Sequence, residues 1–188
     1  MKKILLIAGD FSESLEVFFP YQALNMSGFK VISVAPHKKK GDFVTTAVHD
    51  FEREDTYTEK RGHKFLINTT LETIDVKEFD GLVLPGGRAP EYLRLDQRIL
   101  DISKHFIDNN KPIACICHGM QILTAANLIK DRKVTSHPAI GPDIRLAGGK
   151  YVSVDINDIV VDKNIVSAPA WPANPKWMAA FIKLLNKK

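Results

Sequence analysis

The fold of this chain is decided by the stretch Ile113-Ala114-Cys115-Ile116-Cys117-His118-Gly119-Met120-Gln121. An apolar run over 112–116 is typical of a parallel strand buried on both faces, and the apolar pattern of a helix follows over 122–128. A sharp turn from a strand into a helix needs a small residue, and Gly119 meets that need. The pattern therefore predicts a nucleophile elbow with Cys117 at the turn.

The same alternation of short apolar runs and helical patterns extends to both sides. We expect the other strands at 4–8, 31–35 and 82–84, and the other helices at about 14–27, 99–107 and 175–185. Either Ser12 or Ser14 could cap the first helix. Strands and helices in this order predict an α/β fold, with a mostly parallel sheet and helices on both faces, in a single domain of residues 1–188.

One segment, residues 38–64, does not fit this alternation. It is polar and rich in charge, and its apolar side chains keep no sustained period. We expect it to leave the sheet as a hairpin or an arm that covers the site or a neighbouring subunit.

Composition excludes several classes of protein. With 188 residues, 45% of them hydrophobic and 26% charged, the chain has the balance of an ordinary globular domain rather than of a disordered one. The net charge of +4 is spread over 26 basic and 22 acidic residues, and the basic run 38–40 lacks interleaved aromatic residues, so no nucleic-acid partner is predicted. No apolar run approaches the roughly twenty residues that span a membrane.

Location and redox state follow from the first residues and from the cysteines. The start, residues 1–8, imitates a secretory signal, but no small-residue cleavage site follows it, so it is better interpreted as a strand of a cytoplasmic protein. The two cysteines, Cys115 and Cys117, are separated by one residue, which makes a disulfide between them geometrically poor. We therefore expect two reduced thiols.

Cys117 is the candidate nucleophile. The helix that follows favours a thiolate at its N-terminus, and the backbone N–H groups after Cys117 could form an oxyanion pocket with those of the turn Gly86-Gly87. The alternative is an inert cysteine in the core, which is how we interpret Cys115. Ligands crowded into residues 115–118 could not close one zinc tetrahedron, so we predict no metal site.

Two acidic residues could assist the thiol. Glu16 is surrounded in the sequence by apolar residues, so its pKa should be raised, and it could share a proton with the thiol. Glu91 follows the turn 85–90 in a loop at the same edge of the sheet. The alternative is a solvent-exposed loop carboxylate with no role in the site, and the sequence spacing is the same for both. Among the histidines other than His118, His49 and His137 fall in segments that could reach this edge; surface positions are the simpler interpretation of His37, His63 and His105.

The motifs Leu84-Pro85-Gly86-Gly87-Arg88-Ala89-Pro90-Glu91 and Ile116-Cys117-His118-Gly119, with an acidic residue four before Pro20, resemble the PfpI/ThiJ superfamily over essentially the whole chain. Residues 46–51, 61–63 and 80–93 resemble its glyoxalase III branch, known from plant proteins. The segment 11–16 has one residue more than the peptidase pattern, and counting back from Pro20 selects Glu16 rather than Glu13.

The resemblance implies a flavodoxin-like three-layer sandwich. Its nucleophile would be Cys117 on a strained elbow, paired with His118 and with Glu91 contributed across the interface of a homo-oligomer. Glu16 would be hydrogen-bonded to the thiol and act in proton transfer. Gly86, Gly87 and Gly119 would form the oxyanion and substrate site together with Trp171, whose segment 168–172 differs between branches and shapes the pocket.

The implied function is that of a cofactor-independent enzyme that converts methylglyoxal or glyoxal, with water, to lactate or glycolate. One alternative is a PfpI-type cysteine peptidase or amidase that uses Cys117, His118 and Glu91 for acyl transfer. Another is a non-enzymatic, redox-sensing stress protein in which Cys117 is oxidised to the sulfinate beside Glu16.

Overall fold

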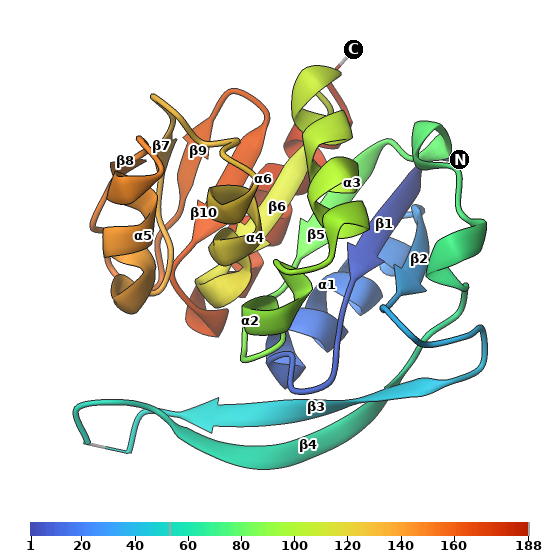
Figure 1. The fold of residues 1–188 in the computed structure, drawn as a ribbon, viewed down its shortest axis with the longest axis horizontal. Helices are drawn as coiled ribbons and strands as arrows, with labels where there is room; N and C mark the ends of the chain where they lie inside the picture. The colour runs from blue at the N-terminus through green and yellow to red at the C-terminus, as the bar shows by residue number, and fades with distance from the viewer. Residues whose placement is uncertain (53, 188) are drawn as a thin grey trace.

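A computed structural model of the protein describes residues 1–52 and 54–187 and is built around one six-stranded sheet (Figure 1). The strand order is β2-β1-β5-β6-β10-β9, in which the first five strands are parallel and β9 is antiparallel to β10. The strands are β1 (Lys3–Ile7), β2 (Lys30–Val34), β5 (Gly81–Leu84), β6 (Ile113–Ile116), β9 (Val160–Asp162) and β10 (Ile165–Ala168).

Helices cover both faces of this sheet (Figure 1). The α-helices are α1 (Ser14–Met26), α2 (Pro90–Leu93), α3 (Gln97–Asp108), α4 (Met120–Ala125), α5 (Gly141–Leu146) and α6 (Asn174–Leu185). One core cluster joins the sheet to α1 and α6, and a second joins its other face to α2, α3, α4 and α5. Short 3-10 helices are η1 (Leu71–Thr73), η2 (Val76–Glu78), η3 (Cys117–Gly119), η4 (Pro138–Ile140) and η5 (Trp171–Ala173).

The predicted fold class is confirmed. Numbered along the chain, the five parallel strands follow the order 2-1-3-4-5, which is that of flavodoxin-like sheets. The strands are apolar on both faces because helices bury both, and every residue of β5, β6 and β10 is buried. Such sheets bind ligands beyond the carboxyl ends of their strands, which directs attention to the residues after β1, β5 and β6.

Residues 38–64 leave the sheet largely as a hairpin. Its strands, β3 (Phe43–Asp50) and β4 (Thr58–Leu66), pair with each other and run beside the main body (Figure 1). The hairpin is joined to the loop after β1 by backbone hydrogen bonds from Phe11 N to Thr45 O and from Ala47 N to Ser12 O. It therefore lies at the carboxyl edge of the sheet.

Two local details differ from the sequence prediction. The N-cap of α1 is Glu13, whose side chain accepts a hydrogen bond from Leu15 N, rather than Ser12 or Ser14. The sequence pattern also did not reveal the edge strand β9, its neighbour β10, or the small pair β7 (Lys133–Val134) and β8 (Lys150–Tyr151). β7, β8 and β9 are two or three residues long, too short for a period to be recognised, whereas β10 is an apolar run as long as β5 and β6 that the prediction missed.

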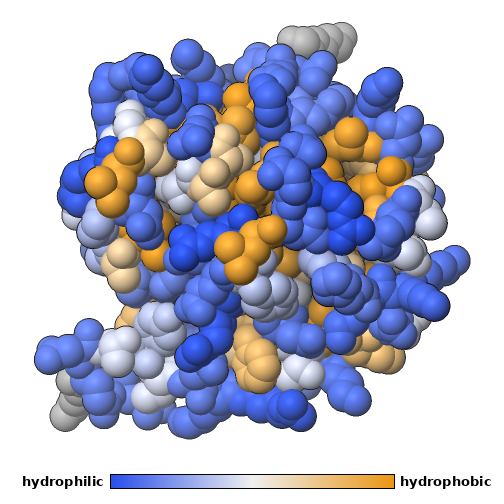
Figure 2. Space-filling view, viewed as in Figure 1, coloured by the Kyte–Doolittle hydropathy of each residue, from blue (hydrophilic) through white to orange (hydrophobic). Residues whose placement is uncertain are grey.

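The surface is mostly hydrophilic on the face that Figure 2 shows. In the face shown in Figure 2, hydrophobic side chains stand in separate groups among hydrophilic ones. Of the helices that the structure describes, none combines the length and the apolar character needed to cross a membrane.

Candidate active site

Cys117 stands on a strained turn between β6 and α4. Its φ of 55° lies in the left-handed region, which costs energy for a residue with a side chain. Gly119 makes the turn possible, because a Cβ at this position would lie 2.4 Å from the carbonyl oxygen of Leu84. The local sequence thus forms an elbow that holds the Cys117 side chain at the carboxyl end of β6.

Glu16, on the first turns of α1, reaches the same point from one face of the sheet. Its side chain is 0% exposed, and Oε2 accepts a hydrogen bond of 2.8 Å from Gly86 N. The approach is so close that a Cβ on Gly86 would lie 2.6 Å from both Glu16 Oε2 and Cys117 Cβ. Burial, and then the charge of Glu13, raise the pKa of Glu16 to about 8, so the carboxyl is mostly protonated at neutral pH.

The Cys117 thiol is subject to opposing influences. Burial and then the charge of Glu16 raise its pKa, while hydrogen bonds from the backbone N–H groups of Gly87 and His118 lower it. When Glu16 is protonated its charge is absent, and the two amides are then free to stabilise a thiolate. The thiol and the carboxyl therefore compete for one proton.

His118 also contacts the thiol, with Nδ1 3.2 Å from Cys117 Sγ. Burial, followed by the charges of His137 and His49, lowers the pKa of His118 to about 4, so the ring is neutral at physiological pH. Glu16 binds a proton far more tightly than this imidazole does. Within one chain, ionised Glu16 rather than His118 is therefore the group that can accept the thiol proton.

A small cavity opens beside these groups. It measures about 20 Å³, close to the room for a single water molecule, and its wall consists of Glu13, Glu16, His49, Phe51, Tyr57, Cys117, His118, His137, Ala170 and Trp171. Two buried polar atoms at its wall, Glu16 Oε1 and Trp171 Nε1, have no hydrogen-bond partner among the described residues. A small polar molecule could satisfy both.

The hairpin and one loop complete the wall of the cavity. The Tyr57 ring makes edge contacts with the rings of His49, His118 and His137, at centroid distances of 5.1, 5.7 and 5.6 Å. His118 and His137 stack at 4.9 Å. The sequence indicated that the segments of His49 and His137 could reach the site, but it carried no signal for Tyr57 or Phe51, whose positions depend on how the hairpin folds over the sheet.

The remaining sequence candidates lie in different surroundings. Cys115 is fully buried within β6. Glu91 lies on α2 rather than in a loop and is exposed; its charge helps to raise the pKa of Tyr57, after burial and the charge of Cys117. Within the described part of the chain, no group of three or more ligating side chains could hold a metal ion.

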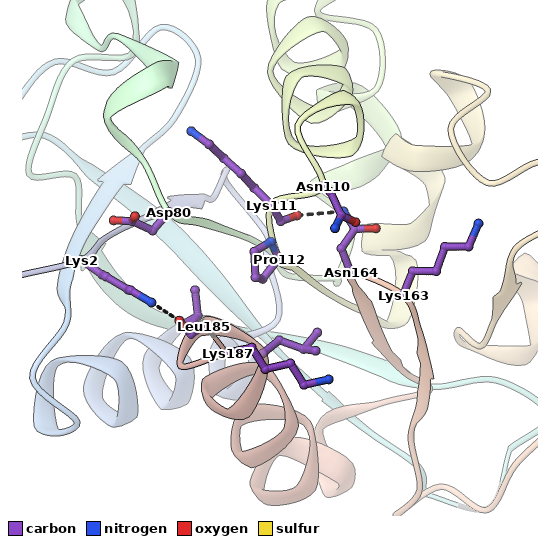
Figure 3. Close-up of a pocket in the computed structure, with 10 residues that line it drawn as sticks. Lys2, Asp80, Asn110, Lys111, Pro112, Lys163, Asn164, Leu185 and Lys187 are labelled. Carbon is purple, nitrogen blue, oxygen red and sulfur yellow. Dashed lines mark hydrogen bonds between the residues drawn. The ribbon is translucent and has the colours of Figure 1, made fainter.

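A much larger hollow lies at the opposite, amino edge of the sheet (Figure 3). It measures about 580 Å³ and is lined largely by lysine and asparagine side chains. Lys111 Nζ donates to the backbone oxygens of Lys77 and Phe79, and Lys2 Nζ donates to Leu185 O, as Figure 3 shows for Lys2. These two lysines hold loops and a helix end together, and the lining includes no cysteine, serine or threonine.

Comparison with known proteins matches this architecture. A profile of the DJ-1/PfpI family matches residues 2–184. Protein DJ-1 homolog D of Arabidopsis thaliana is 44% identical over 98% of this chain, which spans 48% of that relative, about half of its length. A deglycase of Pyrococcus horikoshii is 37% identical over 99% of this chain and 100% of its own. Schizosaccharomyces pombe DJ-1 shares the fold, with a TM-score of 0.81 and 19% identity over 99% of this chain and 93% of that one.

Proposed function

The chain belongs to the DJ-1/PfpI family, and from this premise we propose that it is a cysteine enzyme acting on small dicarbonyls, a glyoxalase that requires no glutathione. The observation that carries the proposal is the pairing of Cys117 with a buried, protonated Glu16 beside a cavity of about 20 Å³. A cavity this small has no room for a peptide, and the hairpin side chains at its wall would have to move to admit even a substrate of a few heavy atoms.

The reaction begins when the Cys117 thiolate attacks the aldehyde carbon, C1, of methylglyoxal and an S–C1 bond forms. The C1 oxyanion is stabilised by the N–H groups of Gly87 and His118, the same donors that lower the pKa of Cys117. Glu16, which holds the proton of the thiol, then donates it to the oxyanion. The product of this step is a hemithioacetal, and Glu16 is left ionised.

Ionised Glu16 next removes the proton from C1, and the electron pair moves through C2 to the ketone oxygen. Glu16 returns this proton to C2, while the proton of the C1 hydroxyl passes to the C2 oxygen. The result is a thioester of lactate. Water adds to the thioester carbon, Cys117 leaves and recovers a proton, and lactate is released. The net reaction adds one water molecule to one methylglyoxal, with no external oxidant or reductant.

A second function has specific support from the comparisons, because the Pyrococcus horikoshii relative is named a deglycase. An acyl-transfer peptidase is less well supported, since it needs an imidazolium to protonate the leaving amine and burial keeps the pKa of His118 at about 4.

The decisive experiment supplies methylglyoxal without glutathione and measures lactate formation by wild type and Cys117→Ser. We expect lactate from wild type and at least ~10³-fold less from the variant, a loss of about 4 kcal/mol of transition-state stabilisation. Equal rates would overturn the proposal. A parallel reaction uses a purified methylglyoxal adduct of an amine. Loss of the adduct faster than its spontaneous release of methylglyoxal would indicate the deglycase instead.

We also propose that the enzyme is a homo-oligomer in which Glu91 orients His118 of a neighbouring subunit. Its exposure in a single chain is compatible with this role. Mixing Cys117→Ala with Glu91→Ala subunits after reversible dissociation should restore part of the activity, because some hybrid sites then hold both wild-type residues. Hybrids that form without regaining activity would contradict a shared site.

A further inference from the structure

A line of charged side chains leads from the active site into the hairpin. His49, on β3, is only 7% exposed and lies between two carboxylates: its Nδ1 is 2.6 Å from Glu13 Oε2, and its Nε2 is 3.1 Å from Glu59 Oε2. Glu59, on β4, is paired in turn with Arg88 Nε at 3.0 Å. The line therefore connects the N-cap of α1 with both strands of the hairpin and with the turn after β5.

The hydrogen bonds fix the charge state of this line. Glu13 Oε1 accepts from Leu15 N at 3.0 Å, and Oε2 accepts from both the backbone N and the ring of His49, so every contact stabilises an ionised carboxylate. Ionised carboxylates accept but cannot donate, so both nitrogens of His49 must carry protons. Burial alone would lower the pKa of His49, but the hydrogen bonds and charges of Glu13 and Glu59 outweigh it and raise that pKa.

The cation matters because Glu13 and Glu16 share one turn of α1. Residues three apart on a helix are neighbours, and both carboxyls are almost fully buried, so a negative Glu13 opposes ionisation of Glu16. His49 carries the positive charge in direct contact with Glu13 and thus offsets its field at Glu16. The other titratable groups around the Glu16–Cys117 pair are Cys115, His118, Tyr57 and His137.

We propose that His49 is a positioning residue that compensates the charge of Glu13 and thereby sets how the proton is divided between Glu16 and the Cys117 thiol. The hairpin would then be more than a cover for the cavity, since it supplies the cation on which the reactivity of the thiol depends. This inference goes beyond the proposed function, because it concerns the thiol whatever the substrate is.

The test measures the rate of Cys117 alkylation by iodoacetamide as a function of pH, read by mass spectrometry, in full-length variants. His49→Gln removes the cation and leaves Glu13 uncompensated, so the midpoint of the profile should rise by roughly one pH unit. Glu13→Gln removes the opposing charge, so the midpoint should fall. In the double variant, His49→Gln should add almost no further shift, because the charge that it compensates is gone.

His63→Gln is the matched control, since it makes the same substitution at an exposed position on the same hairpin and should leave the midpoint at the wild-type value. Shifts of Glu13→Gln and His49→Gln in the same direction, no shift in either, or additive shifts in the double variant would each overturn the proposal. If His49→Gln does not fold, a nitrogen NMR titration of the wild type decides the question. A cationic His49 ring at neutral pH supports the proposal, and a neutral ring overturns it.

The alkylation profile needs no dicarbonyl, so the outcome is independent of the proposed function. If methylglyoxal is not consumed but the midpoints move as expected, the inference about His49 stands and the glyoxalase assignment fails. If methylglyoxal is consumed but the midpoints do not move, the glyoxalase assignment stands and the inference about His49 fails.

Discussion

The two edges of the parallel sheet are built from opposite chemistry. At the carboxyl edge, Cys117 has a left-handed backbone, and Glu16 is completely buried beside a cavity of about 20 Å³. At the amino edge lies a hollow of about 580 Å³ (Figure 3), which is bordered by lysines. One of them is Lys111, whose ammonium group donates to two backbone oxygens. Left-handed backbone occurs at both edges, because Asn110 and Lys163 also have positive φ at the amino edge. Among the described residues that line the two cavities, buried polar atoms without a partner occur only at the carboxyl edge.

This difference shows that the size of a hollow is a poor guide to function. Buried polar atoms without partners, and non-glycine residues with a left-handed backbone, reduce the stability of the fold. At functional sites they are retained because the reaction uses them. Lysines that donate to helix and loop carbonyls, such as Lys2 and Lys111, lower the free energy of the fold and are held in structural contacts. The comparison predicts that substitutions at the carboxyl edge change chemistry, whereas substitutions at the amino edge change stability.

The largest effect should come from Glu16→Gln. The amide keeps the shape of the side chain and can still accept from Gly86 N, but it cannot carry the C1 proton, so methylglyoxal turnover should fall by at least ~10²-fold. Lactate formation measures the change, and circular dichroism verifies the fold. Turnover within about tenfold of wild type would mean that another residue is the base and that the carboxyl edge has been assigned incorrectly.

Much of this edge was predictable from the sequence, because its signals are local. The strand, Cys117 and Gly119 lie within a few residues, and apolar neighbours around Glu16 indicated burial. His49 and Tyr57 came from a polar segment without a period, and their place at the cavity depends on how the hairpin docks. The Glu13 cap had no such signal either, since Ser12 and Ser14 are more usual N-caps and only the hydrogen bond from Leu15 N identifies Glu13 as the cap.

The pH dependence of the free energy of unfolding should also depend on Glu16. Its folded pKa of about 8 lies above the usual value of 4.5, so the folded state binds its proton more tightly than the unfolded state does. Stability from this group is complete below about pH 4.5 and is lost as the pH rises through 8. Between about pH 6 and pH 8 the free energy of unfolding should fall by about 2 kcal/mol in wild type and should stay flatter in Glu16→Gln.

Urea unfolding at the two pH values measures this difference. Glu52→Gln, on the exposed part of the hairpin, is the matched control and should keep the wild-type pH dependence. A Glu16→Gln variant that loses as much stability as wild type on going to the higher pH would show that Glu16 is already ionised in the fold.

A comparison within the carboxyl edge itself separates the two cysteines. Cys117 is 9% exposed at the elbow and accepts from two backbone amides, which lower the pKa of its thiol against the effects of burial and of the charge of Glu16. Cys115 is 0% exposed, and burial and then the charge of Glu16 raise its pKa with no such hydrogen bonds to oppose them. Limiting iodoacetamide should therefore modify Cys117 at least ~10-fold faster. Peptide mass spectrometry gives the two rates, and equal labelling would remove Cys117 as the nucleophile.

The smallest effect on chemistry should come from Lys111→Met at the amino edge. Methionine keeps most of the apolar stem but cannot donate to the backbone oxygens of Lys77 and Phe79, so the variant should lose about 1–3 kcal/mol of unfolding free energy. The lysine lies far along the strands from Cys117, and methylglyoxal turnover should stay within about twofold of wild type, less than ~0.5 kcal/mol of barrier. Urea unfolding and lactate formation measured on the same sample test both statements. Turnover that falls with unchanged stability would mean that the larger hollow takes part in the reaction, and the contrast between the two edges would then fail.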